Sequence, residues 1–62
     1  QRPDQARLVL GRAYFNLGEY NKARSAFREA GKDDRSAKYS KQWIAYVTSE
    51  EDRQRELEKD IF

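Results

Sequence analysis

Cysteine and histidine are both absent from this sequence of 62 residues, and proline occurs only once. Their absence excludes disulfide bonds and removes the thiolate and imidazole ligands that most structural metal sites use. A chain of this length buries only about 60% of the surface that its unfolded form exposes, so its stability is marginal without help. The remaining sources of stability are close helix packing, oligomerisation, or neighbouring repeats in a longer parent chain.

The lack of histidine and cysteine also removes the commonest general base and the strongest side-chain nucleophile. Carboxylates cluster only at 33–34 and 50–52, in polar stretches where we expect no pKa shift. The three glycines are too far apart for a phosphate-binding loop, and no apolar run approaches the ~20 residues of a membrane span. We therefore expect a protein with no enzymatic activity, cofactor, metal or membrane span. The compartment stays open, with the cytoplasm or periplasm favoured.

Charged side chains make up 39% of the chain, but eight aromatic residues argue against disorder. Residues 1–49 carry a net charge of +5 and residues 50–62 a net charge of −3, which gives the overall +2. A basic body with an acidic tail is typical of a solvated surface, and it is also compatible with nucleic-acid contact. The basic residues that would form such a contact are Lys22, Arg24, Arg28, Lys32, Arg35, Lys38 and Lys41.

Apolar residues recur at three- and four-residue steps in three stretches, which predicts three helices and no strands. The first helix is expected to begin at Pro3, with Asp4 as the cap of its first turn. It is expected to end after Leu17, because Gly18 adopts a positive φ at little cost. One face of this helix, apolar except for Arg7, is predicted to contain Arg7, Leu10, Ala13, Tyr14 and Leu17.

The second predicted helix covers about 21–31, with Asn21 as its expected cap and Gly31 at its end. The third begins near Arg35, with Asp33 or Asp34 as a candidate cap, and no later glycine or proline interrupts it. The predicted organisation is an all-α domain: an antiparallel hairpin over 4–34, a packing helix over 35–49, and a charged helical extension or frayed tail over 50–62.

Eight residues of the first two helices and the turn between them keep fixed spacings: Leu10, Gly11, Tyr14, Gly18, Tyr20, Ala23, Phe27 and Ala30. This spacing over residues 4–37 resembles the tetratricopeptide repeat, whose period is ~34 residues and whose pattern is W-x₂-L-G-x₂-Y…A-x₃-F. The chain departs from the pattern at Arg7, where the family prefers tryptophan. It departs again at Arg35, where a proline often closes the repeat, and this allows a different entry angle for the third helix.

The resemblance predicts how the hairpin packs. Gly11 lies in mid-helix, where glycine costs about 1 kcal/mol relative to alanine, so close approach of the second helix is expected to offset that cost. Ala23 is the expected small residue opposite Gly11, with Tyr14 and Phe27 filling the space beside them. The third helix begins like another repeat and then turns polar, as a capping helix does. Its residues Trp43, Ile44 and Val47 are expected to pack on the second helix.

In the family that the chain resembles, the first helix lines a concave groove. The resemblance therefore implies a candidate partner-binding face made of Gln5, Leu8, Arg12, Phe15 and Asn16. Leu8 and Phe15 have an alternative role, in contact with a missing repeat or in packing under the third helix. Arg12 and Asn16 are suited to binding a carboxylate, although Arg12 is also typical of a solvated helix charge.

These expectations lead to a non-catalytic protein–protein interaction module, the C-terminal part of a tetratricopeptide array. Its partners would be a peptide or another protein on the first-helix face, and adjacent repeats of a longer chain. One alternative is self-association through Leu57, Ile61 and Phe62 to form a homo-oligomer. Electrostatic nucleic-acid binding is the less favoured alternative, because no docking motif accompanies the basic residues.

Overall fold

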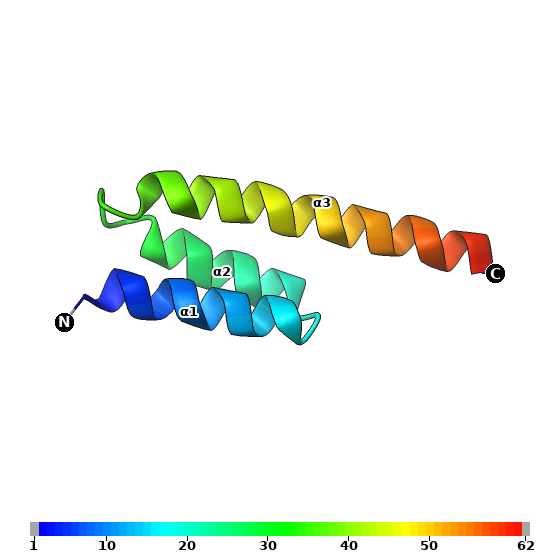
Figure 1. Cartoon of the computed structure of the whole chain (residues 1–62), viewed down its shortest axis with the longest axis horizontal. Helices are drawn as coiled ribbons and strands as arrows, with labels where there is room; N and C mark the ends of the chain where they lie inside the picture. Colours follow the sequence, from blue (N-terminus) through cyan, green and yellow to red (C-terminus); the bar gives the residue numbers. More distant parts are fainter. Residues whose placement is uncertain (1, 62) are drawn as a thin grey trace.

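The computed structural model describes residues 2–61, which form three helices and no strand (Figure 1). Helix α1 spans Pro3–Asn16, α2 spans Tyr20–Ala30 and α3 spans Ala37–Ile61. Helices α1 and α2 form a hairpin, and α3 packs along α2 and extends well beyond it (Figure 1). The predicted all-α architecture, a helical hairpin followed by a third packing helix, is confirmed.

The turn between α1 and α2 is built on Gly18, as predicted. Gly18 has φ of +78°, the only positive φ in the described part of the chain. Its N–H donates to the carbonyl of Phe15 at 3.0 Å, and the N–H of Glu19 donates to the carbonyl of Tyr14 at 2.9 Å. This pair of bonds is the Schellman motif, which satisfies the last carbonyls of a helix and needs a left-handed residue at this position.

The caps predicted for the first two helices, Asp4 and Asn21, are wrong. Arg2 and Glu19 occupy the positions before α1 and α2, and neither helix start has a side-chain capping bond. Asn21 lies inside the first turn of α2, where its side-chain oxygen accepts a bond from Arg24. Asp33 accepts a 2.9 Å bond from the N–H of Arg35, before α3 begins. Local capping rules fail for Asp4 and Asn21 because both side chains bind other side chains.

Glycine follows α2 for a different reason than it follows α1. Gly31 has φ of −70°, a conformation open to any residue. A Cβ on Gly31 would lie 2.7 Å from Oγ of Ser40 and 2.9 Å from its Cβ. Ser40 is buried, with 3% of the residue exposed, and its hydroxyl donates to the backbone carbonyl of Phe27. Gly31 therefore serves close approach of α3 to the end of α2.

The core is centred on Phe27 of α2, which is fully buried together with Ala23 and Val47. A Cβ on Gly11 would lie 2.7–2.8 Å from three atoms of the Phe27 ring. The predicted close approach at Gly11 is therefore present, but the Phe27 ring is its nearest neighbour, where Ala23 was expected. The same ring stacks on Trp43 of α3, with centroids 5.3 Å apart and planes inclined by 13°.

The predicted apolar face of α1 is rotated relative to the real one. Leu10 is 46% exposed and Leu17 is 75% exposed. Leu8 and Phe15, from the neighbouring face, are the side chains of α1 that pack on the core together with Tyr14. A sequence period identifies a helix, but a helix with apolar residues on two faces does not reveal which face meets the rest of the protein.

Helix α3 continues without a break past the end of the hairpin (Figure 1). The last described tie to the hairpin is the ion pair between Arg24 and Glu51, at 3.0 Å. Beyond it, charged side chains pair along the helix, for example Arg55 with Glu51 at 3.7 Å and Lys59 with Glu56 at 3.8 Å. No helix within residues 2–61 combines the length and the apolarity needed to cross a bilayer.

Candidate functional site

The five residues predicted to bind a partner lie along one side of α1. Gln5, Arg12 and Asn16 are exposed, whereas Leu8 and Phe15 are half-buried and pack against the core cluster. The apolar pair therefore contributes to the fold, and the polar residues are the accessible part of this side. Packing under the third helix was one of the two alternative roles predicted for Leu8 and Phe15, and Phe15 does contact Trp43 of α3.

Phe15 joins α1 to an aromatic cluster on α3. Its ring centroid lies 6.4 Å from that of Trp43 and 5.4 Å from that of Tyr46, both on α3, and 5.9 Å from that of Tyr20 at the start of α2. Trp43 and Tyr46 meet edge to face at 5.8 Å. Contacts of this kind contribute about 0.5–1.5 kcal/mol each beyond simple burial, so the cluster fixes α3 against α1.

Trp43 and Tyr46 also form an accessible surface. Tyr46 is 49% exposed and Trp43 is half-buried. Together with Gln42 they line a shallow groove of about 350 Å³. We call Gln42, Trp43 and Tyr46, together with Arg12 and Asn16, the α1–α3 face. Sequence reasoning placed Trp43 in the core and gave it no part in the predicted binding face. Tyr46 lies one turn further along α3, at the spacing that keeps both rings on one side.

Arg12 is held on this face by the indole ring. Its guanidinium carbon lies 5.7 Å from the centroid of Trp43. The cation–π attraction positions the guanidinium group next to the ring. The described contacts of Arg12 include no carboxylate. An exposed guanidinium group beside an aromatic groove is suited to bind a carboxylate through two parallel hydrogen bonds.

A second groove, of about 440 Å³, lies between α1 and α2, and no α3 residue lines it. Its lining mixes apolar and charged side chains: Arg7, Leu10, Tyr14, Asn21, Lys22, Ser25, Ala26 and Glu29. Lys22 lies over the ring of Tyr14, with its Nζ 5.8 Å from the centroid. None of the five predicted binding residues lines this groove.

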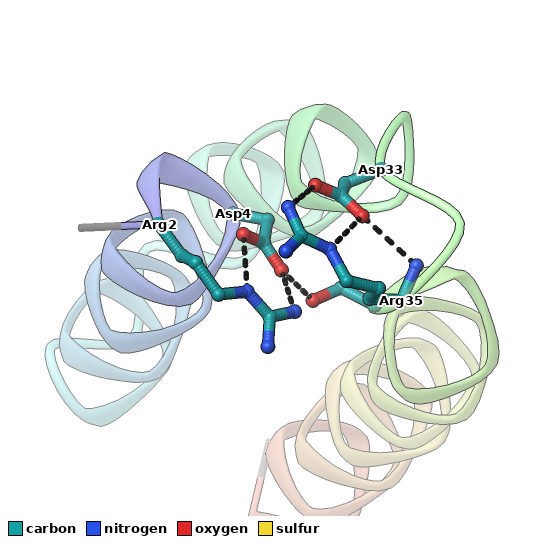
Figure 2. Close-up of polar contacts among 5 residues, drawn as sticks. Arg2, Asp4, Asp33 and Arg35 are labelled. Carbon is teal, nitrogen blue, oxygen red and sulfur yellow. Dashed lines mark hydrogen bonds and ion pairs between the residues drawn. The ribbon is translucent and has the colours of Figure 1, made fainter.

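A polar cluster joins the start of α1 to the connection between α2 and α3 (Figure 2). The Arg2 guanidinium donates to both carboxylate oxygens of Asp4, at 3.2 and 2.6 Å, and the Ser36 hydroxyl also donates to Asp4. Asp4 is 2% exposed, and these bonds, those from Arg2 first, hold its pKa below the ordinary value. Arg35 binds Asp33 in the same way, at 2.6–2.9 Å.

The cluster is a structural tie. The bonds from Arg35 lower the pKa of Asp33 strongly, so the expectation of unshifted carboxylates is wrong at this position. Both carboxylates stay ionised and have donors on their oxygens, an arrangement that suits ion pairing more than proton transfer. Among residues 2–61 there is no group of three potential metal ligands.

Comparison with known proteins gives no relative: no family model, no curated protein and no solved structure matches the chain. The class of this protein is therefore defined by its own fold and its α1–α3 face, without support from a relative. The protein is an all-α helical hairpin with a long third helix packed on it.

Proposed function

We propose that this protein is a non-catalytic protein–protein interaction module that binds a peptide segment on the α1–α3 face. In this proposal the chain is the end of a tetratricopeptide-type array, with α1 and α2 as one repeat and α3 as the capping helix. The observation that carries it is the Arg12 guanidinium held over Trp43, next to the half-exposed ring of Tyr46.

The physical chemistry of the face favours an acidic peptide. The Arg12 guanidinium offers paired donors to a carboxylate, while the Trp43–Tyr46 groove offers apolar surface for a side chain next to it. Gln42 and the exposed Asn16 add hydrogen-bonding groups at the rim. Aromatic rings with an arginine are the residue types that most often dominate binding energy at protein interfaces.

The packing of the hairpin supports the tetratricopeptide part of the proposal. Gly11 lies against the Phe27 ring, Gly18 has the positive φ that the turn needs, and Ala23 and Ala30 are buried. These are positions where the resembling pattern requires small residues. The close packing and the turn in this chain therefore explain why small residues stand at these positions, and the explanation needs no comparison with a relative.

The test begins with a peptide-display library selected against the full chain, followed by titration of the selected peptides. Trp43 is the only tryptophan, so its fluorescence reports binding on the α1–α3 face without a label. Arg12→Ala is expected to weaken binding about tenfold or more, because a desolvated charge-assisted pair contributes about 1.5–3 kcal/mol. Tyr46→Ala is expected to weaken it to a similar extent.

The matched control is Arg28→Ala, which removes an exposed arginine from α2 and leaves the α1–α3 face intact. Phe15→Ala is unsuitable as a binding test, because Phe15 packs on the core cluster and its loss would disturb the fold. Selected peptides that bind Arg12→Ala and Tyr46→Ala as tightly as the unaltered chain would refute the proposed face. Failure to select any peptide would count against peptide binding altogether.

Self-association is the second candidate, supported by Leu57, which is 47% exposed on the free part of α3. The side chain of Ile61 and all of Phe62, which complete the predicted contact, lie outside what the structure describes. Light scattering over a concentration series distinguishes the two candidates, because a mass that stays at that of the monomer excludes self-association.

A further inference from the structure

An unpartnered apolar stripe runs along α1. It consists of Ala6, Val9, Leu10, Ala13 and Leu17, and we call it the α1 stripe. All five residues are exposed, and the larger ones strongly so: Val9 is 64%, Leu10 46% and Leu17 75% exposed. Contiguous apolar residues on the surface of a small domain commonly mark an interaction site.

The structure contains one example of how such a stripe docks. Helix α3 packs on α2 through residues of the same spacing: Ser40, Trp43, Ile44, Val47 and Glu51. Ser40 bonds the carbonyl of Phe27, Trp43 stacks on the Phe27 ring, and Val47 is fully buried. Ile44 packs on the same core, and Glu51 pairs with Arg24 at the far end of the contact.

Each docking residue of α3 lies 34 residues after one member of the α1 stripe. The small Ser40 corresponds to Ala6, and Val47 to Ala13. The larger Trp43 and Ile44 correspond to Val9 and Leu10, which are apolar as well. The fifth pair differs in chemistry, because the apolar Leu17 corresponds to the charged Glu51. The α1 stripe therefore repeats, one 34-residue step earlier, the pattern by which α3 docks.

We infer that the α1 stripe docks on the second helix of another helical hairpin, in the register in which α3 docks on α2. That helix must have the surface of α2, with small residues in the positions of Ala23, Ala30 and Gly31 and an aromatic ring in the position of Phe27. Helix α2 lies between α1 and α3 in a stack of three helices (Figure 1). The inferred helix would be the next member of this stack, packed on the α1 stripe.

A second copy of the chain does not provide this surface. In each copy α3 already covers α2, and both Ala23 and Phe27 are 0% exposed. The occupant is therefore a hairpin whose second helix has no such cover. The inference rests on one part of the proposed function, the stacking of hairpins, and it does not depend on peptide binding at the α1–α3 face.

The inference also explains the exposure of Leu10. This leucine belongs to the spaced pattern of the hairpin, yet 46% of it is exposed. Its equivalent, Ile44, packs against the buried cluster of Ala23, Phe27 and Val47. Leu10 thus has the spacing of a packing residue, and its packing partner is the hairpin that we infer.

The test is a tandem protein in which a copy of residues 1–34 is fused directly before the full chain. This arrangement places the second α1 where α3 would follow the added hairpin. We expect one unfolding transition, with a melting temperature about 10 °C or more above that of the single chain, the size of change that a few apolar contacts produce in a domain of this length. Amide exchange in the second α1 is expected to slow.

Two substitutions in the second α1, Val9→Lys and Leu17→Lys, are expected to abolish the rise in melting temperature. In the single chain the same pair is expected to leave the melting temperature unchanged, because both side chains are mostly exposed. A tandem protein that melts like the single chain would overturn the inference, even with peptide binding at Trp43 intact. Loss of peptide binding with the tandem gain retained would refute only the proposed face.

Two further results would also overturn it. If the lysine pair destabilises the single chain, the α1 stripe belongs to the chain's own core. If the single chain forms a dimer that the lysine pair dissociates, the occupant is a second copy and not an uncovered hairpin.

Discussion

The ring of Phe27 lies against Gly11, so close that a methyl group on Gly11 would be 2.7 Å from the nearest ring carbon. Gly11 is in the middle of α1, where alanine would normally stabilise the helix by about 1 kcal/mol. The Phe27 ring has little freedom to move away, because it is fully buried and stacks on Trp43. Packing therefore opposes helix propensity at this position.

Gly11→Ala is accordingly expected to destabilise the protein by about 1–3 kcal/mol, the usual cost of overpacking a core. Urea unfolding measures the change. In a Phe27→Leu background the smaller side chain leaves room for the methyl group, so the cost of Gly11→Ala should shrink or change sign. An unchanged cost in that background would mean that the ring is not its source.

Helix content and the glycine turn were predictable because they depend on local residues. Gly18 ends α1 through its own backbone freedom, and the apolar spacing identifies three helices. The orientation of α1 was not predictable, because Leu8 and Leu10 lie on different sides of the helix and both are plausible core residues. Only the position of α3, set by contacts distant in sequence, selects between them.

Two valines allow the buried and the exposed sides of the fold to be compared. Val47→Ala removes two methyl groups from a fully buried position and is expected to cost about 1–3 kcal/mol. Val9→Ala removes the same groups from a side chain that is 64% exposed in α1, so it is expected to be neutral or slightly stabilising through helix propensity. Chemical denaturation of both variants measures the difference; equal costs would contradict the assignment of Val9 to the surface.

The α1–α3 face was predicted only in part. Arg12 and Asn16 follow from their spacing on α1, but the contact of Arg12 with Trp43 joins residues far apart in sequence and required the position of α3. The buried carboxylate of Asp4 illustrates the same limit. Its place next to a helix start predicts a cap, whereas the hydrogen bond that it accepts from Ser36 spans 32 residues.

Acid is expected to weaken the tie between Asp4 and Ser36. The pKa of Asp4 is lowered by its bonds from Arg2 and then from Ser36, and the bonds from Arg35 lower the pKa of Asp33. A carboxyl whose folded pKa lies below its unfolded pKa stabilises the protein above the unfolded value, near 3.8 here. That stabilisation is lost as the pH falls from about 4 towards the folded pKa.

Asp4→Asn tests this relation. The variant is expected to melt at a lower temperature than the unaltered chain at pH 7, and the difference should narrow as the pH falls below about 4. Asp34→Asn is the matched control, because it removes an equal charge from an exposed neighbour in the same connection. If the difference in melting temperature between Asp4→Asn and the unaltered chain stays constant down to pH 2, the ionised carboxylate is not the source of that difference.

The free end of α3 is expected to be much less stable than its packed part, although the helix is continuous. Up to Glu51 the helix is held by Val47 in the core and by the Arg24–Glu51 ion pair. Beyond it, stability comes from exposed pairs along the helix, which contribute about 0.3–0.5 kcal/mol each and are screened by salt. Amide exchange should therefore be slow near Val47, fast over 53–59, and faster still over 53–59 in 1 M salt. Uniform protection along α3 would mean that a further contact, such as a second copy on Leu57, covers the free end.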